Sequence, residues 1–196
     1  MVKNILYFKV LLIFLFSVQV LGATEKVKPL PIIQDIFSTA KSKAFKKDKK
    51  LQRKVSFYFN YDKMGTSILA QYATKNNLSD VNWFKKTIKG IITRTVYPEA
   101  REFLSKVSIS HEIAEKSKSS IQVLTLLKKR GEETEVLSDF IKEQGKWRII
   151  NISIDDESWV ENIQEQVHKT IKDKGWKELR KSLTERLDEL IKEDEG

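Results

Sequence analysis

The chain has 196 residues, a formal net charge of +9 at pH 7, and no cysteine. The lack of cysteine excludes both a disulfide framework and an anchor built on a lipid-modified cysteine. A hydrophobic content of 40% argues against disorder and is sufficient for an ordinary apolar core.

The N-terminus carries the three-part pattern of a secretory signal peptide. Lys3 and Lys9 accompany an apolar run over 10–16, and the small residues Gly22 and Ala23 follow it. A membrane anchor is the alternative, but the clean apolar stretch is shorter than the roughly 20 residues that span a bilayer. We therefore predict a signal peptide over 1–22, cleaved after Gly22 or after Ala23, and a single exported domain over 23–196.

Basic residues are in excess, and many of them are close together. Without the two lysines of the signal the net charge is +7, and the segment 41–54 has eight basic residues against the single acid Asp48. Export excludes nucleic acid as a partner and leaves anionic membranes or acidic proteins. A solvated loop or helix face is the simpler interpretation of such a run. The alternative is transient docking on a membrane or partner through Lys46, Lys47, Lys49 and Lys50.

Helical periods dominate the first half of the exported part. A short helix is predicted over 32–37, and a second, capped by Asn60 or Asp62, carries apolar residues at helical spacing over 64–72. Ser79 can cap a third helix, whose apolar stripe extends over 81–95. Pro98 is expected to kink or break this helix.

The hydrophobic period changes to two after residue 106, as in half-buried strands. Four strands are predicted over 107–113, 121–127, 133–141 and 147–154, with turns at Gly131 and at Gln144-Gly145. In the last strand Trp147 and Ile149 are expected to point to one face. The group Ile150, Ile152 and Ile154 is expected to include residues that point to the opposite face of the sheet. Apolar residues on both faces are typical of a central strand that is covered on both sides.

Two helices are predicted to close the chain. Ser158-Trp159-Val160-Glu161 is a capping box that begins one helix, and Gly175 ends it. A last helix begins at Trp176 and keeps its leucines on one stripe. The predicted order is a set of helices, a four-stranded antiparallel meander and two closing helices. This order predicts an α+β domain.

Three stretches carry a specific combination of residues. The first is Phe59-Asn60-Tyr61-Asp62-Lys63-Met64, and the second is the long helix after Trp83-Phe84 that leads through Tyr97 and Phe103 into Val107. The third is Gly145-Lys146-Trp147-Arg148-Ile149, followed by Asn151-Ile152 and by Ser158-Trp159-Val160 with Asn162. In residue types and order they resemble the MlaC, or toluene-tolerance, family of periplasmic phospholipid-binding proteins. Asn60 replaces the usual Asp of that family, and the resemblance covers most of 30–190.

This resemblance implies a half-open, cone-shaped sheet with an apolar cavity between sheet and helices. It also implies a monomeric periplasmic carrier, without a cofactor, that moves phospholipid between an outer-membrane lipoprotein complex and an inner-membrane ABC transporter. The apolar residues expected to line the lipid site are Phe59, Tyr61, Met64, Ile68, Tyr72, Phe84, Ile88, Ile91, Ile92, Phe103, Val123, Leu137, Trp147 and Ile149. Ordinary core packing is the simpler interpretation of each residue taken alone.

Groups for catalysis are scarce in the sequence. There is no cysteine nucleophile and no glycine-rich phosphate loop, and His111 and His168 lack metal-ligand spacing. The electrostatics of a helix N-terminus explain the acidic cluster Asp155-Asp156-Glu157. We therefore predict that the protein is not an enzyme. The alternative is an exported enzyme or a peptide-binding module on a similar sheet, and co-purifying phospholipid would separate the two hypotheses.

Overall fold

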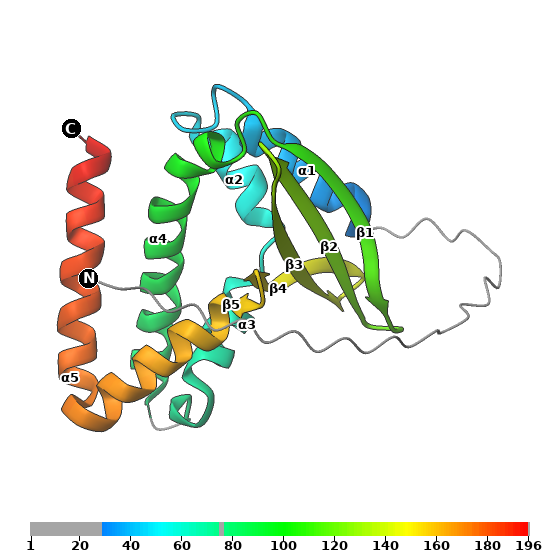
Figure 1. Ribbon diagram of the computed structural model, residues 1–196. Helices are drawn as coiled ribbons and strands as arrows, with labels where there is room; N and C mark the ends of the chain where they lie inside the picture. The colour runs from blue at the N-terminus through cyan, green and yellow to red at the C-terminus, as the bar shows by residue number, and fades with distance from the viewer. Residues whose placement is uncertain (1–28, 75–76, 196) are drawn as a thin grey trace, which may run out of the picture.

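The computed structural model describes residues 29–74 and 77–195, and its elements confirm the α+β class (Figure 1). The predicted signal peptide and its cleavage point lie outside the described residues. The elements in chain order are α1 (Pro29–Lys41), α2 (Lys49–Phe57), α3 (Tyr61–Leu69), the 3-10 helix η1 (Ala70–Tyr72), α4 (Leu78–Phe103), β1 (Ser108–Lys116), β2 (Ser120–Lys129), β3 (Glu132–Glu143), β4 (Lys146–Ile154), β5 (Glu157–Ser158) and α5 (Trp159–Glu195). Helix α1 packs against β1 and β2, while α4 and the C-terminal half of α5 stand side by side (Figure 1).

The sheet is an open antiparallel meander in the order β1-β2-β3-β4-β5. Its two-residue turns are Arg130-Gly131, Gln144-Gly145 and Asp155-Asp156, and both residues of each turn have a positive φ. This is the type I′ geometry, whose twist matches that of the flanking strands. The four predicted strands are confirmed, and the short β5 is an addition that the sequence did not predict.

The acidic cluster at 155–157 lies between β4 and the start of α5, close to the helix N-terminus that the sequence predicted. Asp155 and Asp156 are the two residues of the β4–β5 turn, and the Asp155 carboxylate accepts a hydrogen bond from the Glu135 backbone N–H at 2.9 Å. Aspartate tolerates the positive φ of this turn better than most residues because its short side chain bonds to nearby backbone. The cluster therefore forms the β4–β5 turn and the first residue of β5, directly before α5.

A β-bulge in β4 determines which of its side chains share a face. Ile149 and Asn151 pair with neighbouring residues of β3, so Ile150 is an extra residue in β4. The bulge resets the alternation, and Ile149, Ile152 and Ile154 consequently line the same side of the sheet. Simple alternation, which turns Ile152 and Ile154 away from Ile149, is wrong here because a bulge leaves no mark in a period-two pattern.

Two of the predicted helix caps are present. The Asn60 side-chain oxygen accepts a hydrogen bond from the Lys63 N–H at 2.9 Å, at the start of α3. The Ser158 hydroxyl oxygen accepts one from the Glu161 N–H at 3.2 Å, at the start of α5. Each bond satisfies a backbone donor that has no partner within the helix.

Helix α4 differs from the prediction at its N-terminal cap, and it is not broken at Pro98. It begins at Leu78 after Asn77, so Ser79 lies inside the first turn and does not cap it. It also continues through Pro98 to Phe103 without a break. Proline removes one backbone hydrogen bond, and the burial of Tyr97 and Leu104 on either side of it keeps the helix continuous through tertiary packing.

Gly175 separates α5 into two helical segments, as predicted. Its φ of 79° and ψ of 174° belong to a region that is essentially restricted to glycine. The change of direction at Gly175 brings the C-terminal segment of α5 alongside α4. There a Cβ built on Gly90 would lie 3.0 Å from a Leu187 methyl carbon. Glycine at 90 therefore permits the close approach of the two helices.

The buried apolar residues form two clusters. One lies between α1, α2, the end of α4 and the inner face of the sheet, and the other lies among α3, α4 and α5. The α2–α3 linker joins them: the Ile149 N–H donates to the Tyr58 carbonyl, and the Asn60 N–H donates to the Ile149 carbonyl, both at 2.8 Å. Within the described ranges, no helix combines the length and the apolar character needed to cross a membrane.

Candidate functional site

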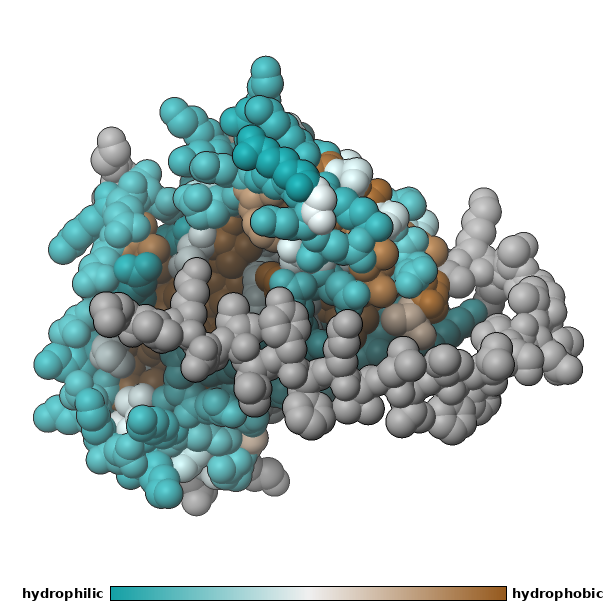
Figure 2. All heavy atoms as spheres, in the orientation of Figure 1, coloured by the Kyte–Doolittle hydropathy of each residue, from teal (hydrophilic) through white to brown (hydrophobic). Residues whose placement is uncertain are grey.

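An apolar pocket of about 410 Å³ lies between α1, α4 and the inner face of β3 and β4. Its volume is in the usual range for small-molecule sites. Figure 2 shows hydrophobic residues gathered in the hollow between α4 and the sheet. The apolar lining residues are Ile33, Ile36, Phe37 and Ala40 of α1, Ile92, Val96, Ala100 and Phe103 of α4, Val136, Ile149, Ile152 and Ile154 of the sheet, and Phe45, Val55, Phe59, Leu104 and Trp159.

Exposure to solvent differs along this pocket. Phe45 and Ile149 are fully buried, whereas Thr95, Glu99 and Phe103 are exposed along one face of α4. Among the residues that the structure describes, Glu99 is the single charged side chain of the lining, and it lies on this exposed rim. The pocket therefore has a dry end under α1 and α2 and an open rim along α4.

Two tyrosines contribute a hydrogen-bonded pair to the pocket wall. Tyr61 comes from α3 and Tyr97 from α4, and their hydroxyl oxygens lie 3.1 Å apart. Both residues are buried. Burial raises the pKa of each hydroxyl above its ordinary value, with the neighbouring Tyr97 adding to the rise at Tyr61. Both hydroxyls are consequently neutral at pH 7, and each provides the other with a hydrogen-bond partner in an otherwise apolar wall.

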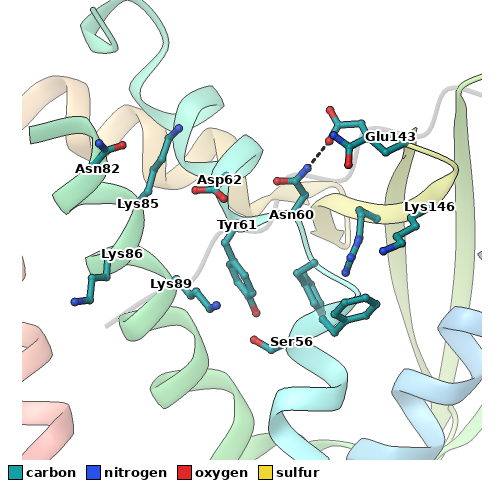
Figure 3. A pocket seen from close by; sticks show the side chains of 14 residues that line it. Ser56, Asn60, Tyr61, Asp62, Asn82, Lys85, Lys86, Lys89, Glu143 and Lys146 are labelled. Atoms are coloured by element: carbon teal, nitrogen blue, oxygen red, sulfur yellow. Dashed lines mark hydrogen bonds between the residues drawn. The ribbon is translucent and has the colours of Figure 1, made fainter. Parts of the chain in front are cut away.

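Two further hollows adjoin the tyrosine pair, and both have charged walls. One, of about 610 Å³, includes Tyr61 in its lining together with Lys85, Lys86 and Lys89 of α4 (Figure 3). The other, of about 480 Å³, includes Tyr97. Hydrocarbon gains little from walls of hydrated charges, so the apolar pocket is the candidate site for an apolar ligand.

The larger charged hollow has an ordered acidic side. The Asn60 amide donates a hydrogen bond to a Glu143 carboxylate oxygen at 2.7 Å (Figure 3), and Lys63 lies 3.1 Å from the other oxygen. Phe57, which also lines this hollow, is 57% exposed, and the Arg148 guanidinium lies 3.7 Å from the centre of its ring. These contacts explain why a large aromatic side chain is tolerated at the surface.

Comparison with known proteins agrees with this architecture. The family model described as "MlaC protein" matches residues 30–185. The chain belongs to the MlaC family. A solved structure, the phospholipid-binding protein from Ralstonia solanacearum in complex with a phospholipid, is similar with a TM-score of 0.69 and 14% sequence identity, over 86% of this chain and 99% of that chain. At this identity the likeness shows a shared fold. No curated protein matches the sequence.

The structure of this MlaC-family chain gathers some of the predicted lining residues around the pocket. Those that line it are Phe59, Tyr61, Ile92, Phe103 and Ile149. They come from the α2–α3 linker, α3, α4 and β4. Tyr61, Ile92 and Ile149 are buried, whereas Phe103 is 50% exposed at the rim.

Most of the other predicted lining residues lie in packed regions away from this pocket. Met64, Ile68, Phe84 and Ile88 are buried in the cluster among α3, α4 and α5, with Tyr72 packed against it. Val123 and Trp147 belong to the cluster of the sheet without lining the pocket, and Ile91 is half-buried outside it. Leu137 lies on the opposite face of β3, because Val136 and Ser138 line the pocket and successive strand residues alternate.

The sequence analysis predicted none of the lining residues that come from α1. Ile33, Ile36, Phe37 and Ala40 line the pocket, although only the helix itself was predicted there. Their spacing of three and four residues is the pattern of one helix face. That pattern was visible in the sequence, but nothing in it indicated that this face lies opposite β4.

The four lysines predicted to dock on a partner lie next to one another in the chain but in two kinds of structure. Lys46 and Lys47 lie in the loop after α1, and Lys49 and Lys50 lie in the first turn of α2, which Asp48 caps. All four lysines are exposed, and the Lys49 ammonium lies 3.6 Å from the Asp194 carboxylate. The structure thus places all four near the same corner of the molecule.

The two histidines make structural contacts. His111 Nδ1 lies 2.9 Å from the Thr125 hydroxyl, and its ring packs against Phe37. His168 Nε2 lies 3.1 Å from the Leu69 carbonyl, and its ring meets the edge of Tyr72. Within 29–74 and 77–195, no group of three or more His, Asp or Glu side chains has the arrangement of a metal site.

Proposed function

We propose that this protein binds phospholipid and holds its acyl chains in the apolar pocket. The observation that supports this most strongly is the composition of the lining, in which Glu99 at the exposed rim is the only charged side chain from the described ranges 29–74 and 77–195. A site for hydrocarbon needs dry, apolar walls and few precisely placed polar groups. The Ralstonia solanacearum protein of the same fold was solved with a phospholipid, which supports the same ligand class here.

The proposed orientation follows from the exposure along the pocket. The acyl chains extend toward the fully buried Phe45 and Ile149, where water is excluded. The polar headgroup stays at the rim near Thr95 and Glu99, where it keeps its hydration. In this orientation neither part of the lipid loses favourable solvation.

The energetics are those of a carrier. Burial of about 15 methylene groups, those of one acyl chain, at ~0.8 kcal/mol each is worth roughly 12 kcal/mol relative to water. A membrane gives the same chains nearly the same stabilisation, so transfer between membrane and pocket is close to neutral. The protein therefore needs to shield the chains in transit and does not need to bind them more tightly than a bilayer does.

As an MlaC-family carrier, the protein is proposed to act in the periplasm after cleavage of the signal peptide, as one domain over 23–196. It receives and delivers phospholipid between an outer-membrane lipoprotein complex and an inner-membrane ABC transporter. Lys46, Lys47, Lys49 and Lys50 are the proposed contact to an anionic membrane or acidic partner. The lipid is cargo, and the proposal requires no catalytic step and no cofactor.

The test is the lipid content of the purified protein. Expressed with its signal and recovered from the periplasm, the protein is expected to carry phospholipid in native mass spectrometry. Ala100→Trp adds an indole at a half-buried wall position of α4 and is expected to reduce the lipid-bound fraction at least tenfold. Ala114→Trp, at an exposed bulge position of β1, is the matched control and is expected to keep the lipid.

Two results would contradict the proposal. One is a folded wild-type protein that neither carries phospholipid nor takes it up from vesicles, which would favour the exported enzyme or peptide-binding module. The other is full lipid occupancy in Ala100→Trp, with a circular dichroism spectrum like that of the wild type. That result would place the lipid outside this pocket.

A further inference from the structure

Ser138 is an exception in the sheet wall of the apolar pocket. It lies on β3, is fully buried and lines the pocket. Its inward-facing neighbours along the strand are Val136 and Phe140, and its partner on β4 is Ile152. A hydroxyl therefore interrupts a surface that is otherwise apolar.

The Ser138 hydroxyl has no hydrogen-bond partner in the described part of the structure. The other buried hydroxyls on this side of the sheet are paired: Tyr61 with Tyr97, and Thr125 with His111. A buried hydroxyl without a partner destabilises a protein, and such groups are uncommon in native structures. An atom of a ligand that accepts a hydrogen bond at this point would remove that cost.

The position of Ser138 along the wall restricts which ligand atom can reach it. Along β3, Ser138 lies between Val136, which pairs with the half-buried Ile154, and Phe140, which pairs with the fully buried Ile149. Ser138 thus lies between a partly exposed position of the wall and the closed end, where the chains are proposed to lie.

We infer that Ser138 donates a hydrogen bond to an acyl ester carbonyl oxygen of the bound lipid. This inference rests on the proposed function. The ester groups join the chains to the headgroup, carry acceptors and no donors, and are the last polar atoms before the hydrocarbon. Ser138 is therefore a specificity residue that distinguishes ester-linked from ether-linked chains, since an ether has no carbonyl oxygen.

The experiment compares two lipids with the same headgroup. Delipidated protein is incubated with vesicles that contain equal amounts of dipalmitoyl phosphatidylglycerol and its dihexadecyl ether analogue, and the bound lipids are resolved by native mass spectrometry. The wild type is expected to bind the diester in about threefold to tenfold excess, the effect of one net hydrogen bond. Ser138→Ala is expected to bind the two lipids equally, and Ser138→Thr, which keeps the hydroxyl, is expected to retain the preference.

A second measurement uses the lipid-free protein. Ser138→Ala removes a hydroxyl that has no partner, so its melting temperature is expected to equal or exceed that of the wild type. A decrease of several degrees would show that the hydroxyl bonds within the protein and would overturn the inference. A lipid preference in Ser138→Ala equal to that of the wild type would also overturn it.

The outcomes separate this inference from the proposed function. If the wild type binds both lipids equally, Ser138 has no ester partner and the inference fails, while phospholipid binding stands. If the folded wild type binds neither lipid, both the inference and the proposed function fail.

Discussion

The hydroxyl groups of Tyr61 and Tyr97 lie 3.1 Å apart and form a hydrogen bond that joins α3 to α4 in the wall of the apolar pocket. The two residues are 36 positions apart in the sequence. Their pairing ties the helical cluster of α3, α4 and α5 to the cluster that packs on the sheet. The stability of the pocket therefore depends on a polar contact at the junction of two apolar clusters.

The first prediction is that the two tyrosines are energetically coupled. Tyr61→Phe or Tyr97→Phe alone leaves the other hydroxyl buried without this partner and is expected to cost about 1–3 kcal/mol. The double variant removes both hydroxyls and is expected to cost less than the sum of the single variants, by about 1 kcal/mol. Urea unfolding of the four proteins measures this cycle. Additive single effects would show that the hydroxyls do not stabilise one another.

The second prediction concerns alkaline pH. Burial raises the pKa of both tyrosines in the folded protein, whereas in the unfolded chain a tyrosine ionises near pH ~10. The unfolded state therefore loses these protons first, so their contribution to stability is complete below about pH 10 and decreases as the pH rises above it. The urea-unfolding free energy is expected to decrease less steeply above about pH 10 in the Tyr61→Phe/Tyr97→Phe double variant.

The control for that experiment is Tyr72→Phe, in the cluster of α3, α4 and α5. Its alkaline slope is expected to stay closer to that of the wild type than the slope of the double variant does. Identical slopes in the wild type and the double variant would mean that other groups cause the alkaline loss of stability.

The third prediction concerns Asn151, which ties β4 to α5. Its amide nitrogen donates to the Asp139 carboxylate at 3.0 Å, and its side-chain oxygen lies 3.2 Å from the Ser158 hydroxyl and accepts from the Val160 N–H at 3.3 Å. Asn151→Ala removes these contacts and is expected to destabilise the protein by about 2 kcal/mol, since one of them involves a charged acceptor. Urea unfolding measures the change.

Asn162→Ala, on the exposed side of α5, is the matched control and is expected to change stability by less than about 0.5 kcal/mol. Equal effects of the two substitutions would show that the contacts of Asn151 are replaced by water without loss. The β4–α5 junction would then depend on apolar packing alone.

The fourth prediction tests the proposed docking segment. Replacement of Lys46, Lys47, Lys49 and Lys50 by Gln is expected to weaken binding to phosphatidylglycerol vesicles at least tenfold at low salt, since each lysine near an anionic surface contributes about 1 kcal/mol. The wild-type affinity is expected to decrease as salt is added, because salt screens these charges. Vesicle flotation measures both effects.

The control removes the same charge elsewhere. The exposed lysines of α5 chosen for it are Lys169, Lys172, Lys177 and Lys181, each replaced by Gln. Binding that decreases equally in both quadruple variants would assign the effect to net charge. Unchanged binding in the first variant would remove 46–50 as a contact.

Local chemistry in the sequence determined the boundaries of several elements. Asn60 and Ser158 cap helices in the structure, Gly175 divides α5, and Gly131 and Gly145 adopt the positive φ of the hairpin turns. Each of these features depends on residues within a few positions of one another. These caps and turns can therefore be predicted from the sequence without knowledge of the fold. The order of helices and strands, which supports the MlaC resemblance, can be predicted in the same way.

Only the tertiary structure decided which apolar residues line the pocket. Periodicity shows that Phe84 and Ile36 both face inward, but it cannot show that Phe84 packs among α3, α4 and α5 while Ile36 lines the pocket. The bulge at Ile150 likewise turned Ile152 and Ile154 toward the pocket. Burial is a property of one face of an element, whereas a pocket arises from the faces that several elements leave unfilled, and that depends on how they pack.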